Sequence, residues 1–177
     1  MDENINLVNE SGVRIGSIEK LAAHVEGKLH EAFSIFVFNN DHDLLLQRRA
    51  FDKYHSGGLW TNTCCSHAHV GEKIGNAVHR RLVEEMGFDC ELTMNFNFLY
   101  KTNQLTNNLI EHEFDYVFSG LVTEKIDITP NPAEVCDFKW ISIDNLLNDV
   151  SLNPTAYTEW LKIILKSSKF SQMLLSE

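Results

Sequence analysis

The residues with the clearest capacity for chemistry are Cys64, Cys65 and His67, which lie close together in the sequence. A thiol near cations or near a helix N-terminus ionises more readily, and it can then take up or return a proton close to neutral pH. Cys65 stands in a polar segment before a predicted helix, but sequence order does not decide between it and Cys64. This segment therefore predicts a proton-transferring thiol, whereas Cys90 and Cys136 are interpreted as buried and inert.

Two carboxylates and several imidazoles form a second set of chemical groups. Glu111 and Glu113 lie in a predicted strand, so both project from one face, where like charges need a cation or a shared proton. A solvated strand face is the alternative interpretation. With His24, His30 and His67 the two carboxylates suit an octahedral divalent ion such as Mn²⁺, Mg²⁺ or Zn²⁺. The other histidines that we considered are interpreted as surface or hydrogen-bonded residues: His42, His55 and His79.

A third pattern is a helix predicted over residues 72–86, with Gly87 as its C-terminal cap. Residues 66–88 resemble the Nudix box, G-x5-E-x7-R-E-U-x-E-E-x-G-U. The matching residues are Glu72, Arg80, Leu82, Glu84, Glu85, Gly87 and Phe88. Ser66 replaces the first glycine, and Arg81 replaces a glutamate that helps Nudix hydrolases to hold the magnesium ions that activate water. The resemblance therefore implies a Nudix-like fold, while Arg81 argues against hydrolysis.

The elements that must position these groups are strands and helices of ordinary length. Apolar patterns and turn residues predict strands at 5–8, 13–18, 32–38, 44–49, 92–100, 110–119 and 138–141. Further helices are predicted near 143–150 and from Asn153 onward, with Pro154 in the first turn. The sum is an α+β fold, a central mixed β-sheet packed against helices, in one domain over residues 1–177.

Two of these strands alternate in a way that assigns their faces. In 92–100 one face is predicted to carry Leu92, Met94, Phe96, Phe98 and Tyr100. In 110–119 the aromatic residues point one way, and the other face carries Glu111, Glu113 and Asp115. Because an aromatic face belongs in a core, we expect the acidic face to line solvent or a cleft.

Composition narrows the possible partners and location. The net charge of −10 argues against a general nucleic-acid binder, which needs a cationic surface. The sequence shows no secretory signal, and no apolar run is long enough to span a bilayer. Its four cysteines have neither a disulfide framework nor a zinc-binding spacing. We therefore expect a cytoplasmic protein, a monomer or weak dimer, that binds neither nucleic acid nor membrane.

Taken together, these motifs resemble type I isopentenyl diphosphate isomerases, which are Nudix-fold enzymes. The matching segments are 22–24, 29–34, 45–49, 60–67 and 111–113. The resemblance runs from about Ile5 to Trp160, and the cysteine segment followed by two glutamates is its most specific part. Two departures from the family's pattern lie on either side of the cysteine segment. Before this segment, the usual Pro-Gly turn is replaced by Ser56, Gly57 and Gly58, which should loosen the loop. After His67, Ala68 stands where the family commonly has proline.

The resemblance implies a role for each site residue. The five ligands of a single divalent metal ion would be His24, His30, His67, Glu111 and Glu113. Cys65, rather than Cys64, falls on the catalytic thiol. Glu113 matches the carboxylate on the opposite side of the substrate's double bond, supported by Tyr100. Glu85 is implied to help hold Mg²⁺ at the diphosphate. The residues around the diphosphate and closing the pocket would be Lys20, Arg49, Lys53, Arg81 and Trp160.

The implied reaction interconverts isopentenyl and dimethylallyl diphosphate and feeds isoprenoid biosynthesis. One proton is added and another removed through a carbocation-like intermediate, with metal-bound Glu113 delivering and Cys65 removing, or the reverse for the back reaction. The ring of Trp160 would stabilise the positive charge by several tenths to about 2 kcal/mol. Arg81 then grips the phosphate where a hydrolase places a metal-binding carboxylate.

Two other functions are compatible with a Nudix-like fold. A Nudix hydrolase would cleave a diphosphate, and Arg81 is the residue that distinguishes the two activities. A catalytically silent binding module would have lost catalytic residues, but each of the residues named above is present. The isomerase interpretation accounts for both the replacement in the Nudix box and the thiol.

Overall fold

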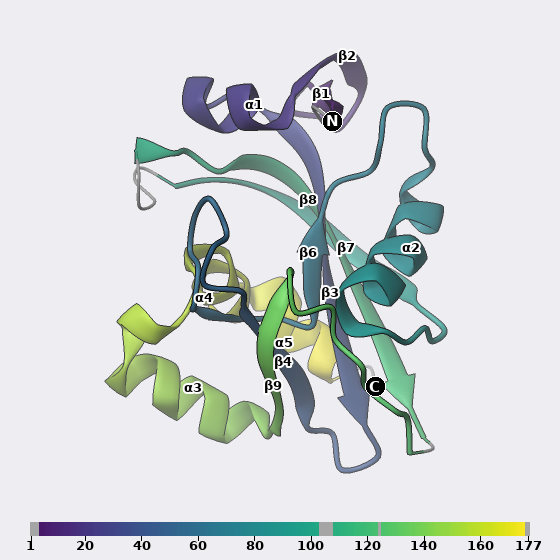
Figure 1. Cartoon of the computed structure of the whole chain (residues 1–177), viewed down its shortest axis with the longest axis vertical. Helices are drawn as coiled ribbons and strands as arrows, with labels where there is room; N and C mark the ends of the chain where they lie inside the picture. The colour runs from purple at the N-terminus through teal and green to yellow at the C-terminus, as the bar shows by residue number, and fades with distance from the viewer. Residues whose placement is uncertain (1–3, 103–107, 124, 176–177) are drawn as a thin grey trace.

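The computed structural model describes residues 4–102, 108–123 and 125–175, shown as coloured ribbons in Figure 1. In these ranges the strands are β1 (Asn4–Val8), β2 (Arg14–Glu19), β3 (His30–Asn39), β4 (Leu44–Arg49), β5 (Trp60–Thr61), β6 (Cys64–Ser66), β7 (Thr93–Lys101), β8 (His112–Val122) and β9 (Val135–Ile141). The helices are α1 (Lys20–Glu26), α2 (Ile74–Met86), α3 (Ile143–Leu152), α4 (Glu159–Leu165) and α5 (Ser168–Leu174). The predicted α+β fold with a mixed sheet is confirmed.

Strand β3 is the centre of the sheet. Nine of its ten residues are buried, as its continuous apolar run predicts for a strand covered on both faces. It runs parallel to β8, with His30 opposite Glu113, and antiparallel to β6, with Ser34 opposite Cys65. Paired residues project from the same face, and so do residues four apart in one strand. The register therefore places the Cys65 thiol and the Glu113 carboxylate on one face of the sheet.

Helices cover both faces of this sheet (Figure 1). On one face α2 buries Ala77, Val78 and Leu82 against apolar side chains of β3 and β8. On the other face the C-terminal helices α4 and α5 supply Leu161, Ile164, Phe170 and Met173. Burial of this much apolar surface is the main stabilising contribution to such a fold. The site residues lie beyond the edge of the second core, where polar side chains replace the apolar ones.

Strand β7 departs from the predicted alternation. Its pairing with β8 shifts between Met94 and Phe96, which is a β-bulge that adds one residue and reverses the faces beyond it. Leu92 consequently packs on the α2 side, Met94 is exposed, and Phe96 and Phe98 pack on the other side with Tyr100. The prediction of a single shared face was wrong before the bulge and correct after it. The bulge matters because it turns the Tyr100 side toward the site.

Helices α1 and α4 also differ from the sequence-based expectation. Helix α1 was not predicted, although the Glu19 carboxylate caps its first amides at 2.8 Å and Gly27 ends it at φ +61°. The last helix was expected to begin at Asn153. That side chain instead donates to Asp149 at 2.7 Å, a 3₁₀ turn follows, and α4 starts only at Glu159. In the described part of the chain no helix is long and apolar enough to cross a membrane.

Candidate active site

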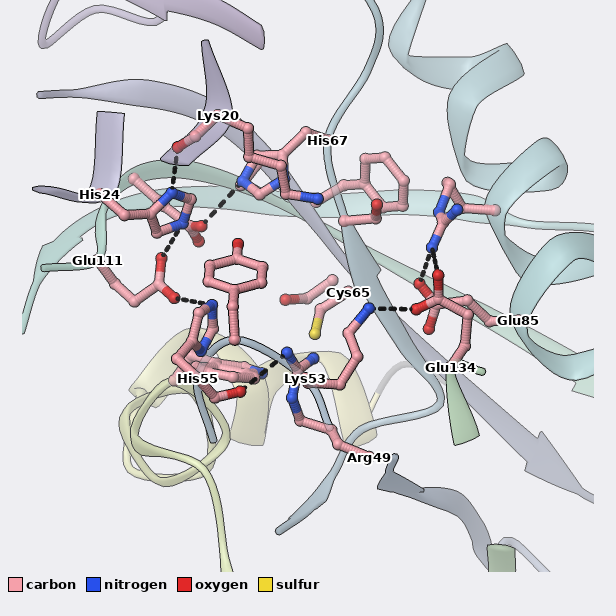
Figure 2. A pocket seen from close by; sticks show the side chains of 18 of the residues that line it. Lys20, His24, Arg49, Lys53, His55, Cys65, His67, Glu85, Glu111 and Glu134 are labelled. Atoms are coloured by element: carbon pink, nitrogen blue, oxygen red, sulfur yellow. Dashed lines mark hydrogen bonds and ion pairs between the residues drawn. The ribbon is translucent and has the colours of Figure 1, made fainter. Parts of the chain in front are cut away.

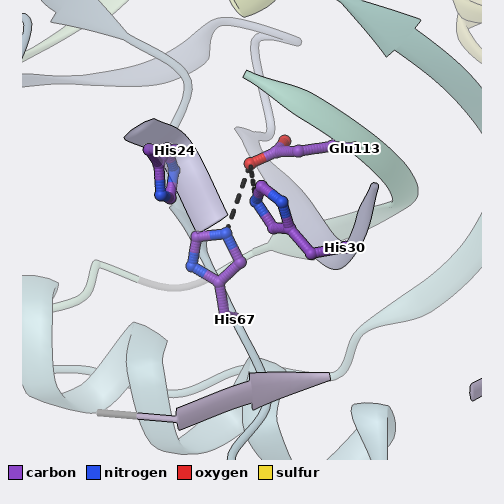
Figure 3. Close-up of side chains that lie close together, drawn as sticks. All are labelled: His24, His30, His67 and Glu113. Carbon is purple, nitrogen blue, oxygen red and sulfur yellow. Dashed lines mark hydrogen bonds and ion pairs between the residues drawn. The ribbon is translucent and has the colours of Figure 1, made fainter. Parts of the chain in front are cut away.

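A cluster of imidazoles and one carboxylate forms one end of a buried pocket (Figure 3). Helix α1 supplies His24, β3 supplies His30, the segment after β6 supplies His67, and β8 supplies Glu113. One possible ligand atom from each of the four lies within 4.8 Å of the others, and all four residues are buried. Glu111 adjoins them, since its Oε2 lies 3.1 Å from Nε2 of His24. The structure thus brings together the five residues predicted as metal ligands.

The orientation of two imidazoles fits a metal ion. Nδ1 of His24 donates to the carbonyl of Lys20 at 2.6 Å, and Nδ1 of His30 donates to the carbonyl of Lys28 at 2.8 Å. A carbonyl only accepts, so the proton sits on Nδ1 and the lone pair of Nε2 faces the cluster. Both Nε2 atoms and Oε2 of Glu111 are buried without a hydrogen-bond partner among the described residues. Lone pairs that face carboxylate oxygens in this way call for a cation.

The electrostatics of the cluster agree with this assignment. Burial lowers the pKa of His67 to about 3, so its imidazole is neutral and able to bind a metal ion at neutral pH. Burial alone would raise the pKa of Glu113, but the imidazoles of His30 and His67 hold it well below its usual range. The residues present therefore fit a divalent metal ion.

Tyr100 and Glu113 form the second part of the site. They lie opposite each other in the β7–β8 pairing, and the Tyr100 hydroxyl donates to Oε2 of Glu113 at 2.6 Å. Burial, and to a smaller extent the charge of Glu113, raises the pKa of Tyr100 well above its usual value. The phenol therefore keeps its proton. Oε1 of the same carboxylate lies 3.2 Å from Nε2 of His67. One oxygen thus faces the imidazoles and the other is held by a neutral donor.

The thiol that reaches the pocket is that of Cys65 (Figure 2). Neighbouring residues in a strand point to opposite faces, so Cys64 is fully buried in the core on the α2 side while Cys65 faces the pocket. Burial raises the pKa of Cys65 to about 12, against the opposing charge of Arg49. The prediction of a readily ionised thiol at a helix N-terminus was wrong. Cys65 lies in strand β6, and α2 begins only at Ile74.

The other cysteines match their prediction in part. Cys90 is half-buried and packs against the core on the α2 side. Cys136 is exposed, so its interpretation as a buried residue was wrong. Its position in β9 turns the side chain outward, and its Sγ donates to the carbonyl of Arg49 at 3.2 Å. Neither thiol lines the pocket that contains Cys65.

Cations line the pocket as well: Figure 2 shows Lys53 beside Glu134, away from the histidines, whereas Lys20 lies next to His24 and Arg49 next to His55. The predicted diphosphate-binding residues Lys20, Arg49, Lys53 and Arg81 line it. Arg81 donates to Glu85 at 2.6 Å, and Lys53 donates to Glu134 at 2.5 Å. Oε2 of Glu85 also accepts from Gln47 at 2.8 Å. The structure therefore places Glu85 among the cations, apart from the histidine cluster.

The side chain of Trp160 lines the pocket and forms part of its wall. The residue is buried in α4, and its indole Nε1 donates to the hydroxyl of Thr61 at 2.8 Å. The guanidinium of Arg49 lies 5.3 Å from the centre of its ring. A ring fixed in this way can stabilise a cationic group in the pocket through its π-face. Its predicted location in the site is consistent with the structure.

Two pocket residues were missed by the sequence analysis. His55 is buried in the loop between β4 and β5, and its Nε2 lies 3.3 Å from Oε1 of Glu111. It was interpreted as a surface or hydrogen-bonded residue, and the second alternative holds, since its Nδ1 lies 3.3 Å from the Ser56 hydroxyl; its place in the pocket was missed because an irregular loop has no periodicity that reveals side-chain direction. Glu134, the partner of Lys53, directly precedes β9. That strand begins at Val135, earlier than the predicted start at 138, so Glu134 appeared to lie in a loop far from the sheet.

Comparisons with known proteins place this geometry in a family. The model of the NUDIX domain family matches residues 28–161, so the fold and the α2 motif are those of a Nudix domain. The solved structure of DR0079 from Deinococcus radiodurans has a TM-score of 0.73 at 19% identity. The match covers 91% of this chain and 96% of that one, and supports the fold alone.

Closer relatives narrow the family. An isopentenyl-diphosphate Delta-isomerase 2 of Aromatoleum aromaticum is 48% identical, over 93% of this chain and 86% of that protein. A protein of the same name from Photorhabdus laumondii is 47% identical, over 98% of this chain and 96% of that protein. The chain belongs to the isopentenyl-diphosphate Delta-isomerase family of Nudix proteins.

Proposed function

We propose that this pocket interconverts isopentenyl diphosphate and dimethylallyl diphosphate by adding one proton to the isopentenyl group and removing another. The observation that carries the proposal is that Cys65 and Glu113 reach one pocket from separate strands, and that the same pocket is lined by imidazoles of the histidine cluster and by cations. The pocket then contains an acid and a base for proton transfer, a set of possible metal ligands, and cations that can bind a diphosphate. The relatives described above carry the name of this activity.

The proton transfers balance between the two groups. In the substrate-free chain the raised pKa of Cys65 keeps its proton on sulfur, whereas Glu113 is ionised. In this state the roles are the reverse of those expected from the sequence for the forward direction: the S–H bond of Cys65 breaks as a C–H bond forms at one alkene carbon, which leaves a tertiary carbocation. Glu113 then takes a proton from the carbon on the other side, and those electrons form the new double bond. The opposite direction starts with the proton on Glu113 and the thiolate on Cys65, so each group serves as acid and base in turn.

The surrounding side chains stabilise this charge distribution. Tyr100 holds one oxygen of Glu113 and fixes the carboxylate's direction. The face of Trp160 contributes several tenths to about 2 kcal/mol to a cation beside it. The carbocation must also be protected from water, which would capture it as an alcohol. The burial of Tyr100, Trp160 and Glu113 provides a site from which water can be excluded.

We propose that the histidine cluster holds one divalent ion, Mn²⁺, Mg²⁺ or Zn²⁺. Its ligands would be His24, His30, His67, Glu111 and Glu113. Such an ion supplies positive charge that orients the carboxylate of Glu113 and adjusts its affinity for a proton. The neutral state of His67 and the unpartnered Nε2 atoms of His24 and His30 support this ligand set.

The cationic end is proposed to hold the diphosphate without cleaving it. Lys20, Arg49, Lys53 and Arg81 would bind phosphate oxygens, and Glu85 would help to hold a Mg²⁺ ion that accompanies the diphosphate. Nε of Arg49 and of Arg81 are buried without hydrogen-bond partners in the described residues, which supports anion binding there. Arg81 stands where a hydrolase places a metal-binding glutamate, and it pairs with Glu84, which disfavours the hydrolase alternative.

The partner of this protein is then a small isoprenoid diphosphate, and the product feeds isoprenoid biosynthesis. We propose that the chain acts in the cytoplasm as a monomer or weak dimer and as one domain over residues 1–177. The formal net charge of −10 supports a soluble protein without a nucleic-acid partner.

Deuterium incorporation from solvent tests the proposal directly. Isopentenyl diphosphate incubated in D₂O with the metal-loaded chain should gain deuterium and appear as dimethylallyl diphosphate. Cys65→Ala should lower this rate by about 10²–10⁴-fold, the usual contribution of a general acid or base. Cys90→Ala, a thiol outside the pocket, is the matched control and should act as the unaltered chain does. Full activity in Cys65→Ala, or release of phosphate without isomerisation, would contradict the proposal.

A further inference from the structure

The loop between β4 and β5 places a fourth imidazole beside the histidine cluster. His55 is 5% exposed, and the proposed proton transfers make no use of it. One possible ligand atom each from His24, His55 and Glu111 lie within 4.8 Å of one another. His55 faces Oε1 of Glu111 at 3.3 Å, while Oε2 faces His24 at 3.1 Å. The carboxylate of Glu111 therefore lies between two imidazoles, as Figure 2 shows.

This second group is too small to be a separate metal site. His24 can bind a metal ion only through Nε2, because its Nδ1 donates to the carbonyl of Lys20. That Nε2 atom already belongs to the cluster with His30, His67 and Glu113. Without His24, only His55 and the shared Glu111 remain. Two protein ligands rarely hold a divalent ion that keeps its own site. The role of His55 must therefore be sought in its contact with Glu111.

The ring of His55 is held firmly in this position. It packs edge-on against Tyr54 at 4.4 Å and against Trp160 at 5.8 Å between ring centres. Its Nδ1 lies 3.3 Å from the hydroxyl of Ser56, and its carbonyl accepts from Arg49 at 3.3 Å. A hydroxyl can donate to Nδ1, which leaves the proton of a neutral imidazole on Nε2 and directs it at Glu111.

The loop that carries His55 is itself closed by its own backbone. The amide of Arg49 donates to Leu59 and the amide of Gly58 donates to Arg49, each at 3.0 Å. Gly57 packs so closely on Phe51 that a Cβ there would lie 2.5 Å from its carbonyl oxygen. Small residues at these positions allow the turn that brings His55 inward. The segment that replaces the usual Pro-Gly turn thus delivers an imidazole to the metal site.

We infer that His55 is a positioning residue of the metal site, whose Nε2–H donates to Oε1 of Glu111 and aims Oε2 at the ion. The inference rests on the proposed divalent site. Residues that orient a ligand in this way commonly change metal affinity by about 10–100-fold when they are replaced. His55 also joins the two ends of the pocket, because Arg49, a proposed diphosphate ligand, binds its carbonyl.

Binding of Mn²⁺ to the full chain without substrate tests the inference. The signal of free Mn²⁺ in electron paramagnetic resonance gives the dissociation constant. His55→Ala should raise this constant about 10–100-fold. His55→Gln, whose amide can donate from nearly the same place as Nε2, should restore it to within a few-fold. His79→Ala is the matched control, since His79 on α2 pairs with Asp89 and does not line the pocket.

The same samples separate a positioning residue from a ligand. Pulsed resonance of bound Mn²⁺ counts the imidazole nitrogens that couple to it, and the count should be the same in the unaltered chain and in His55→Gln. A count that falls by one would make His55 a ligand and overturn the inference. Unchanged affinity in His55→Ala would overturn it as well. If the unaltered chain bound no Mn²⁺, the proposed metal site would fail too, whereas isomerase activity is tested separately by deuterium incorporation.

Discussion

The two ends of the pocket are built on different principles. At the end proposed to hold the metal ion, the Nδ1 atoms of His24 and His30 donate to backbone carbonyls, and Nε2 of His24 lies 3.1 Å from Oε2 of Glu111. At the diphosphate end, the side chains of Lys53 and Arg81 already pair with carboxylates. The first end is held by hydrogen bonds to the backbone, whereas the second is held by ion pairs that must exchange partners when an anion arrives.

Because of this difference, we expect one end of the pocket to bind a metal ion and the other to bind the diphosphate. A cluster held by backbone bonds keeps its geometry and can be filled by a metal ion before substrate binds. Ion pairs between flexible side chains reform around phosphate oxygens at little cost, because one anion replaces another. Of the two proposed proton-transfer groups, Glu113 belongs to the histidine cluster, and Cys65 lines the same pocket. Changes at each end should therefore affect different measured quantities.

Glu113→Gln is expected to have the largest effect, because Glu113 belongs both to the metal end and to the reaction. Loss of its charge should lower isomerisation by at least about 10³-fold, since a proton-transfer group and a metal ligand are removed together. It should also raise the Mn²⁺ dissociation constant. Glu91→Gln on the exposed surface is the control. Retention of a tenth of the activity would show that Glu113 is not the reacting carboxylate.

The elements of the fold with a regular apolar pattern could be predicted from the sequence, and the irregular ones could not. Strand β3 and helix α2 were predicted because each carries a continuous or helical apolar pattern that matches its burial. The β-bulge in β7 was not, because one inserted residue leaves no mark on a local pattern of alternating aromatics. Helix α1 is short and depends on its caps at Glu19 and Gly27, which alone are weak signals.

In the site, residues on regular elements were easier to predict than residues in loops. Alternation assigned Glu113 to a face lining solvent or a cleft, the family resemblance assigned Tyr100 to the site, and the β7–β8 pairing brings the two residues opposite each other. The direction of His55 depends on a turn with Ser56 at φ +52° and a close contact at Gly57, which composition does not reveal. The pKa of Cys65 depends on its burial in a strand, and burial is a property of the packed molecule rather than of neighbouring residues.

Lys53→Ala tests the diphosphate end and should have a smaller effect than Glu113→Gln. Removal of one charge-assisted hydrogen bond to phosphate costs about 1.5–3 kcal/mol, so KM should rise about 10–100-fold while kcat changes less. The Mn²⁺ dissociation constant measured without substrate should not change, because Lys53 pairs with Glu134 and not with the histidines. Lys166→Ala, at an exposed position after α4, controls for the loss of one positive charge. A parallel loss of metal affinity would show that the two ends are not separate.

The smallest expected effect is the pH dependence of metal binding. Burial, together with the charge of Glu113, raises the pKa of Glu111. Although burial opposes it, the contact with Glu111 raises the pKa of His24. The metal-free pair therefore retains a proton to higher pH than either group would alone, and a metal ion must displace it.

Affinity for Mn²⁺ should consequently rise with pH, by up to about tenfold per unit while one proton is released. Titrations near pH 6 and pH 7.5 would measure the change, and proton release into weak buffer would count the protons. Substrate binding by the cations of the pocket should respond instead to ionic strength, because salt screens the attraction between their charges and the diphosphate. If the affinity for Mn²⁺ changed with ionic strength but not with pH, no proton would be shared between His24 and Glu111. That result would contradict the proposed difference between the two ends of the pocket.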